Sequence, residues 1–284
     1  MRADCLCNIR ASTPRAIVEK LNAEIVKIPH QPDTRERLAA DGAEPAGTTI
    51  REFELFIRNE IAKWSKVLRA AKIVRAGLLQ WKGKPLTSEI VRAEADSTVL
   101  RAGGVPEGTI VAGGRQACDP HERGHGPLRA HELIILDIFP RDACTGYFGD
   151  LTRTVVRGRA NTAQRQLWDT VCAAQRLAIR AIKPRAKGAA VHKAVQEFFV
   201  ARGYPTERRD GRWTGFFHGT GHGLGLDLHE EPRLGVTTFR LGQVFTVEPG
   251  LYYPEIGGAR HEDVVTVTAS GCRLLSRLRV PLEL

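Results

Sequence analysis

The 284-residue sequence predicts an α+β fold in which antiparallel hairpins carry helices on one face. From about residue 86 onward, short apolar and β-branched runs are separated by turn residues, as in strands joined by hairpins. Two longer segments, about 162–182 and 189–201, have helical character and are followed by Pro184 and Gly203. Because residues 1–77 contain mainly helical signals, we expect a helical N-terminal segment there and a second domain over 78–284.

Three helices are expected in the N-terminal segment. The first begins with Thr13 as N-cap and Pro14 at the first helical position. A short second helix covers about residues 32–42, and a third runs from about 49 to 71 with its apolar residues on one side. Such a side must be buried, so we expect the third helix to cover an exposed face of the sheet.

The second domain is expected to begin with a helix from Thr87 to about Ala102. Hydrophobic runs bounded by turn residues then predict strands. These are expected at about residues 109–112, 133–139, 151–157, 244–247 and 264–268.

Four carboxylates lie where the predicted strands meet turns. Asp137 ends one strand and Asp150 begins the next, while Glu248 and Glu262 flank a second hairpin whose turn is expected to contain Gly257-Gly258. The two hairpins share one order, which is carboxylate, turn, carboxylate. We therefore expect two related halves that face each other across a pseudo-twofold axis, with a fifth ligand between them.

Carboxylates packed this closely repel one another and raise each other's pKa values unless cations compensate them. Together with one imidazole, from His222, they form a ligand set for two divalent cations such as Mn²⁺, Co²⁺, Zn²⁺ or Fe²⁺. Two ions about 3.5–4 Å apart can share a water molecule and turn it into a hydroxide. The expected chemistry is hydrolysis of a carbonyl-type bond.

Several histidines accompany the ligand set. His218, His222 and His229 lie in one glycine-rich segment, where the backbone can approach a ligand closely. Only one imidazole is needed for metal, so the others can orient substrate or stabilise an oxyanion. His121, in a loop after a strand, is a further candidate, whereas His192 is expected to be a surface or packing residue.

Composition narrows the expected partners. The formal net charge is +10, but the basic residues are scattered and mostly arginine, which disfavours a nucleic-acid role. No apolar stretch of about 18 residues is present, so we expect no membrane partner. The first residues lack the apolar run of a signal peptide, which favours a cytoplasmic location. Trp213 and the other tryptophans are expected to serve packing.

Four ordered motifs resemble a known family. They are DIFPRDACTGYFGDLTRT, HGTGHGLGLDLHE, TVEPGLYY and GGARHEDVV. In this order they resemble the pita-bread metallopeptidases, which include methionine aminopeptidase, aminopeptidase P and prolidase. The resemblance covers about residues 78–284 and implies a curved antiparallel sheet. Arg260 and Asp263, which flank the last carboxylate, are more similar to the aminopeptidase P and prolidase branch, which favours peptides with proline in second position.

The resemblance also implies roles for the candidate ligands. Asp137 would bind one metal ion, Asp150 and Glu262 would bridge both, and His222 and Glu248 would bind the other ion. Glu248 would also handle the proton of the bridging water.

For the remaining histidines, the resemblance implies contacts with substrate and with the developing oxyanion. These residues are His121, His218 and His229. The implied partners are a short peptide substrate and, as an option, a second copy of the chain in a homodimer.

The N-terminal segment has a resemblance of its own. Residues of about 10–73 are similar to the C-terminal end of solute-binding proteins of tripartite tricarboxylate transporters. This match covers only a fraction of such a two-lobed binder.

Three functions therefore remain open from the sequence. The first is a dinuclear metallopeptidase that hydrolyses the N-terminal bond of short Xaa-Pro peptides, with manganese as the expected metal. The second is an inactive member of the same fold that acts as a binding module. The third is a solute-binding remnant, which the missing lobe disfavours.

Overall fold

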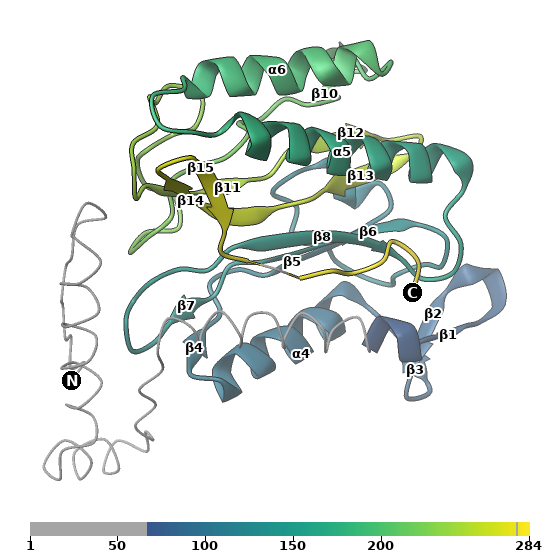
Figure 1. Ribbon diagram of the computed structural model, residues 1–284. Helices are drawn as coiled ribbons and strands as arrows, with labels where there is room; N and C mark the ends of the chain where they lie inside the picture. Colours follow the sequence, from purple (N-terminus) through teal and green to yellow (C-terminus); the bar gives the residue numbers. More distant parts are fainter. Residues whose placement is uncertain (1–66, 277) are drawn as a thin grey trace, which may run out of the picture.

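The computed structural model describes residues 67–276 and 278–284 (Figure 1). The three predicted N-terminal helices lie outside this part of the chain, apart from the end of the third. There, Leu68 and Ala71 are fully buried in a core cluster that also contains residues of the central sheet.

The central sheet consists of three antiparallel strands in the order β5-β6-β8. They are β5 (Ile110–Gly113), β6 (Leu133–Ile138) and β8 (Leu151–Val156). Every residue of β6 and β8 is buried, so both faces of this sheet need a covering layer. Each strand lies within about a residue of its predicted range.

A second sheet has the order β11-β14-β15, and an antiparallel hairpin, β12-β13, lies beside it. The strands are β11 (Val244–Val247), β14 (Asp263–Thr268), β15 (Gly271–Leu274), β12 (Gly250–Tyr253) and β13 (Gly257–Arg260). The smaller pairings involve β1 (Lys72–Ile73), β2 (Leu79–Trp81), β3 (Lys84–Pro85), β4 (Gly104–Val105), β7 (Arg141–Asp142), β9 (Glu207–Arg209) and β10 (Arg212–Thr214). Two short 3₁₀ helices cover Arg75–Gly77 and Gln116–Cys118.

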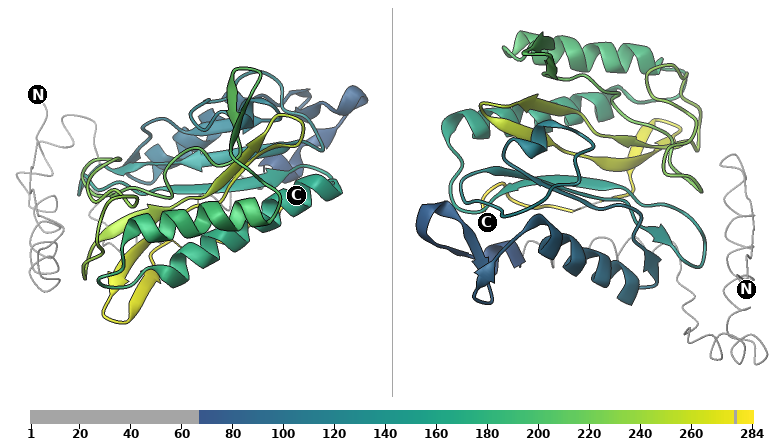
Figure 2. Two further views of the ribbon diagram at one scale, coloured as in Figure 1. Left: turned by 90° about the horizontal axis from the view of Figure 1, so that it is seen from above. Right: turned by 180° about the vertical axis from the view of Figure 1, so that it is seen from behind.

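The helices lie on both sides of the sheets, which corrects the expectation of a single helical face. Helix α4 (Ser88–Arg101) lies on one side, and α5 (Thr162–Ala181) and α6 (Gly188–Ala201) lie on the other (Figures 1 and 2). The buried faces of β6 explain this arrangement. Ile134 packs in the cluster that contains α4 residues, whereas Leu133 packs in the cluster of α5 and α6.

Helix starts follow the sequence signals. Thr87 caps α4 by accepting a hydrogen bond from the backbone of Ile90. Asn161 and Gln164 form a reciprocal capping box at the start of α5. None of the described helices is long and apolar enough to cross a lipid bilayer.

The expected turn at Gly257-Gly258 is wrong, because both residues lie in β13. The turn of this hairpin covers residues 254–256 instead. A Cβ atom on Gly258 would lie 1.9 Å from the carbonyl oxygen of Ala117. Glycine is required there for the close approach of two backbones, not for a turn.

Candidate metal centre

Two antiparallel hairpins bring the carboxylates to one place. In the β6-β8 pair, Asp137 is opposite Thr152, and Asp150 directly precedes β8. In the β11-β14 pair, Val247 is opposite Asp263, so Glu248 and Glu262 continue this pairing beyond the strand ends.

Three of the predicted ligands form a compact group. Asp150, His222 and Glu262 each offer a ligand atom, and these atoms lie within 4.8 Å of one another. His222 Nε2 also lies 3.5 Å from Glu248 Oε1 and 3.6 Å from Asp150 Oδ2. Asp137 is outside this compact group, although its charge raises the pKa values of Asp150, Glu248 and Glu262.

The orientation of His222 suits a metal ligand. Its Nδ1 is 3.0 Å from the carbonyl oxygen of Gly223, which can only accept, so Nδ1 carries the proton and the Nε2 lone pair faces the carboxylates. Burial lowers the pKa of His222 to about 4, which keeps the ring neutral. Gly221 permits the local backbone path, because a Cβ there would lie 1.9 Å from the carbonyl oxygen of Thr246.

Two properties of the carboxylates, oxygens without hydrogen-bond partners and raised pKa values, indicate that a bound cation would stabilise them. Three buried oxygens, Asp137 Oδ1, Asp150 Oδ1 and Glu262 Oε1, have no hydrogen-bond partner among the described residues. Burial, and then repulsion by neighbouring carboxylates, raises the pKa values of Asp150 and Glu262 well above their usual range. Burial also raises the pKa of Glu248 to about 7. This donor set fits divalent cations, which bind oxygen and one imidazole.

Arg260 connects the carboxylates to His218. Its Nη2 lies 2.5 Å from Asp137 Oδ2, and its Nη1 donates to the hydroxyl of Tyr252 at 3.1 Å. Tyr252 in turn lies 2.8 Å from His218 Nε2, while His218 Nδ1 is 2.8 Å from the carbonyl oxygen of Gly219. Nδ1 must therefore be the donor, and the Tyr252 hydroxyl donates to Nε2. Burial lowers the pKa of His218 to about 3, so this ring is neutral.

Sequence reasoning singled out Arg260 but missed Tyr252. The signal was present in the motif TVEPGLYY. Its role became visible only with the β12-β13 hairpin, which pairs Tyr252 with Gly258 and brings it near Arg260.

A second network, of hydrogen bonds and one ion pair, holds Glu262 in place. Thr152 Oγ1 donates to Glu262 Oε2 at 2.7 Å, and Arg153 Nη1 donates to the Glu262 carbonyl oxygen at 2.5 Å. Arg153 Nη2 also pairs with Asp263 Oδ1 at 2.7 Å, and both side chains are nearly inaccessible. Gln175 of α5 donates to the other Asp263 oxygen. Glu262 is therefore held through both its side chain and its backbone.

The other two candidate histidines lie at the periphery. The His229 ring is 4.3 Å from the His222 ring, centroid to centroid, and is exposed. His121 is also exposed, and its charge lowers the pKa values of His218 and His229. All eight predicted site residues thus belong to one region, and the His121 loop is joined to it by the hydrogen bond from Arg260 Nη1 to the Pro120 carbonyl oxygen at 3.2 Å.

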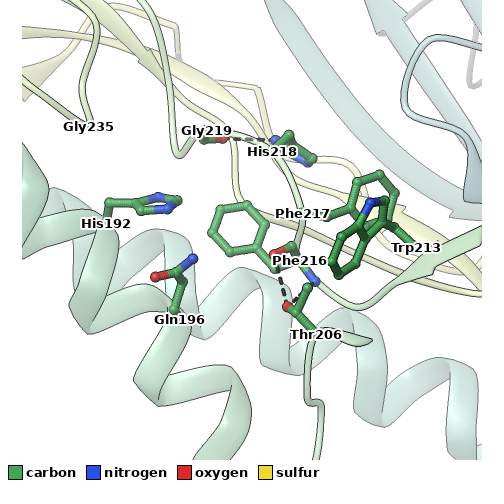
Figure 3. Close-up of a pocket in the computed structure, with 9 residues that line it drawn as sticks. All are labelled: His192, Gln196, Thr206, Trp213, Phe216, Phe217, His218, Gly219 and Gly235. Carbon is green, nitrogen blue, oxygen red and sulfur yellow. Dashed lines mark hydrogen bonds between the residues drawn. The ribbon is translucent and has the colours of Figure 1, made fainter. Parts of the chain in front are cut away.

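A pocket of about 500 Å³ adjoins this region (Figure 3). His192 and Gln196 of α6 line it together with Trp213, Phe216 and His218. The sequence did not predict this pocket. Trp213 was expected to serve packing, but 57% of it is exposed, because it lies on the short β10 strand at the pocket.

Comparison with known proteins identifies the family. The profile of metallopeptidase family M24 matches residues 57–269. The Xaa-Pro dipeptidase of Pyrococcus furiosus is 34% identical over 173 residues, which is 60% of this chain and 47% of that protein. The Xaa-Pro aminopeptidase 1 of Streptomyces coelicolor is 37% identical over 198 residues, which is 60% of this chain and 40% of that protein. The chain thus spans about half the length of the curated relatives it matches.

Solved structures support the fold. The prolidase of Pyrococcus furiosus superposes with a TM-score of 0.67 and 27% identity, over 80% of this chain and 62% of that chain. The pita-bread fold expected from the motifs is therefore confirmed. The similarity of residues of about 10–73 to solute-binding proteins stays a prediction. From the profile match over most of its length, the chain belongs to metallopeptidase family M24.

Proposed function

We propose that this chain is a dinuclear metal-dependent exopeptidase that hydrolyses the N-terminal bond of short peptides of the Xaa-Pro type. The observation that carries the proposal is the set of three buried carboxylate oxygens without partners, beside a neutral imidazole whose Nε2 faces them. Burying such groups without compensation is costly, and divalent cations would compensate them. The names of the relatives, Xaa-Pro dipeptidase and Xaa-Pro aminopeptidase, suggest the substrate class.

We assign the ligands in two groups. Asp137 holds one ion, Asp150 and Glu262 are shared, and His222 and Glu248 hold the other. Bound ions would supply Lewis acidity and lower the pKa of a water molecule. Manganese is the proposed metal, since oxygen-rich ligation with one imidazole suits it. The site is proposed to lie wholly within residues 78–284, with residues 1–77 as a separate helical segment.

Glu248 is the proposed proton acceptor. Its side chain is 18% exposed, compared with 6% for Asp150 and 10% for Asp137, so water reaches it most easily. Thr246 Oγ1 donates to Glu248 Oε1 at 3.3 Å, and the Glu248 amide donates to the Thr220 carbonyl at 2.9 Å. The first bond orients the carboxylate and the second fixes the backbone that carries it, as a general base requires.

His121, His218 and His229 are the proposed substrate contacts. Among the described residues, the rings of His121 and His229 make no hydrogen bond, so their N–H groups are free to donate to a substrate carbonyl or oxyanion. His218 already uses both ring nitrogens. To contact the substrate, Nε2 would give up its hydrogen bond with the Tyr252 hydroxyl and form one with the substrate instead.

The test is metal-dependent cleavage by the purified full chain. We expect the chain to release alanine from Ala-Pro and Ala-Pro-Gly when Mn²⁺ is present and not when a chelator is present. His222→Ala should abolish cleavage, whereas Glu197→Ala, which changes an exposed carboxylate on α6, should leave it unchanged. Cleavage retained in His222→Ala would refute the ligand assignment, and no cleavage with any divalent metal would favour the inactive binding module.

A further inference from the structure

The pocket beside α6 carries no formal charge. Of the described residues that line it, none is Asp, Glu, Lys or Arg. Burial lowers the pKa values of both of its histidines, His192 and His218, so each ring is neutral near pH 7. A free carboxylate or ammonium group would find no countercharge here.

One residue, His218, connects the pocket to the candidate metal centre. Its ring lies in the pocket wall, 5.0 Å from the Phe216 ring and 5.4 Å from the Tyr252 ring, centroid to centroid. Its Nε2 lies 2.8 Å from the Tyr252 hydroxyl, which accepts a hydrogen bond from Arg260, the ion-pair partner of Asp137. A peptide bound at the metal centre that contacts His218 therefore reaches the wall of this pocket.

The pocket wall combines apolar surface with neutral hydrogen-bonding groups. Figure 3 shows His192 and Gln196 on one side of the Phe216 ring, and Trp213 with Phe217 on the other. The Gln196 amide makes no hydrogen bond to any described residue, and His192 uses only Nδ1, at 2.8 Å from Thr220 Oγ1. Val200, one helical turn beyond Gln196, is 59% exposed and continues the apolar surface.

These properties fit an uncharged stretch of peptide with a large side chain. Ring faces suit an apolar or aromatic side chain. The Gln196 amide can donate to and accept from one peptide group. A volume of about 500 Å³ accommodates a residue with its flanking amides, since ligand pockets span about 300–1,000 Å³.

We propose that this pocket binds the third residue of a peptide, on the leaving-group side of the scissile bond, and prefers a large apolar side chain there. The inference rests on the proposed exopeptidase function. The first residue carries an ammonium group, which requires the carboxylates or ions of the metal centre, and an exopeptidase has only that residue on the amino side. We therefore place the chain beyond proline in the uncharged pocket, which favours peptides longer than two residues over the dipeptide.

The kinetic test compares peptides that differ only in the third residue. For the Mn²⁺-loaded full chain, kcat/KM for Ala-Pro-Phe-amide should exceed that for Ala-Pro-Gly-amide by about tenfold, as for a well-filled apolar pocket. Trp213→Ala and Gln196→Ala should each reduce this ratio. Lys193→Ala, an exposed change on the same helix, is the matched control and should not. An equal rate for the two peptides, or variants that instead alter preference for the first residue, would overturn the proposal.

A binding measurement separates this inference from the proposed activity. Trp213 fluorescence in the metal-free full chain should change on addition of Ala-Pro-Phe-amide, with Trp213→Phe as the blank. This signal does not depend on turnover, so a chain that cleaves nothing still reports on the pocket. No fluorescence difference between the wild type and the blank would overturn the pocket assignment even if Xaa-Pro cleavage is observed.

Discussion

Arg260 Nη2 and Asp137 Oδ2 lie 2.5 Å apart in an ion pair whose side chains are 4% and 10% exposed. The pair joins β13 to β6 and so fixes the β12-β13 hairpin against the central strand of the β5-β6-β8 sheet. The same guanidinium donates to Thr152 Oγ1 at 3.2 Å and to the Tyr252 hydroxyl. One cation therefore positions a candidate ligand and two hydrogen-bonding groups around the metal centre.

Tyr252→Phe tests the outer half of this arrangement. The ring is fully buried and stays in place, but Arg260 loses an acceptor and His218 loses the donor to Nε2. We expect kcat for Ala-Pro-Gly to fall by about tenfold or more, as for loss of a positioned hydrogen bond. Calorimetric affinity for Mn²⁺ should remain within error, because no ligand is changed. A parallel loss of metal affinity would show that Tyr252 acts on the site as a whole.

Arg153→Met tests the support behind Glu262. The change leaves Asp263 as a buried carboxylate without its cation, and we expect a loss of about 3–5 kcal/mol in the free energy of unfolding. Urea denaturation of the metal-free protein measures this. Arg165→Met is the control, because its pair with Glu283 is about half exposed and should contribute about 0–1 kcal/mol. Equal losses in the two variants would contradict a special role for Arg153.

The stability of the metal-free protein should depend on the ionisation of Glu248. Its pKa is raised from 4.5 to about 7 in the folded state, chiefly by burial, so the folded state binds more protons than the unfolded state between these values. The stabilisation of the folded state by protonated Glu248 is fully present below pH 4.5 and is lost as pH rises through about 7. Glu248→Gln cannot ionise, so its stability relative to the wild type should increase over this range, by about 1–3 kcal/mol.

Thermal denaturation in the presence of chelator, from pH 4.5 to pH 8, tests the prediction for Glu248. Titrating groups that do not interact with Glu248 are common to both proteins and cancel in the difference. A difference that is constant with pH, or that shrinks as pH rises, would rule out the raised pKa.

Metal binding should release protons at pH 7. Burial raises the pKa of Glu248 to about 7, and burial raises the pKa values of Asp150 and Glu262 well above their usual range, so the metal-free site binds protons more tightly than free carboxyl groups do. Ligation requires the ionised form. Calorimetric titration with Mn²⁺ in buffers of different ionisation enthalpy should show a net release of protons and an affinity that increases with pH. Identical heats in all buffers would contradict protonated ligands.

The sequence predicted the parts of the site that depend on residues close to one another in the chain. Asp137, Asp150, Glu248 and Glu262 lie at strand ends, and strand ends follow from hydrophobic runs and turn residues. The capping signals of α4 and α5 likewise act over a few residues. Within the described residues from 87 onward, the predicted strands and helices were accordingly confirmed within a residue or two.

Features that depend on long-range packing were not predicted. The β12-β13 hairpin was interpreted as a turn, since glycine in sequence does not reveal whether it serves a turn or a close backbone contact. The pocket requires β10, α6 and the segments around His218 and Gly235 to meet, and its lining residues extend over 43 positions, from His192 to Gly235. Only tertiary structure places an exposed Trp213 and a half-buried His192 in the wall of one pocket.

The most direct test of the central claim measures bound Mn²⁺ per chain and Ala-Pro-Gly hydrolysis on the same samples during a metal titration. Two ions held by Asp137, Asp150, His222, Glu248 and Glu262 predict that hydrolysis rises with occupancy and levels off at two ions per chain. The account would be contradicted by full hydrolysis in samples from which a chelator has removed the metal, or by two bound ions with no hydrolysis of any Xaa-Pro peptide.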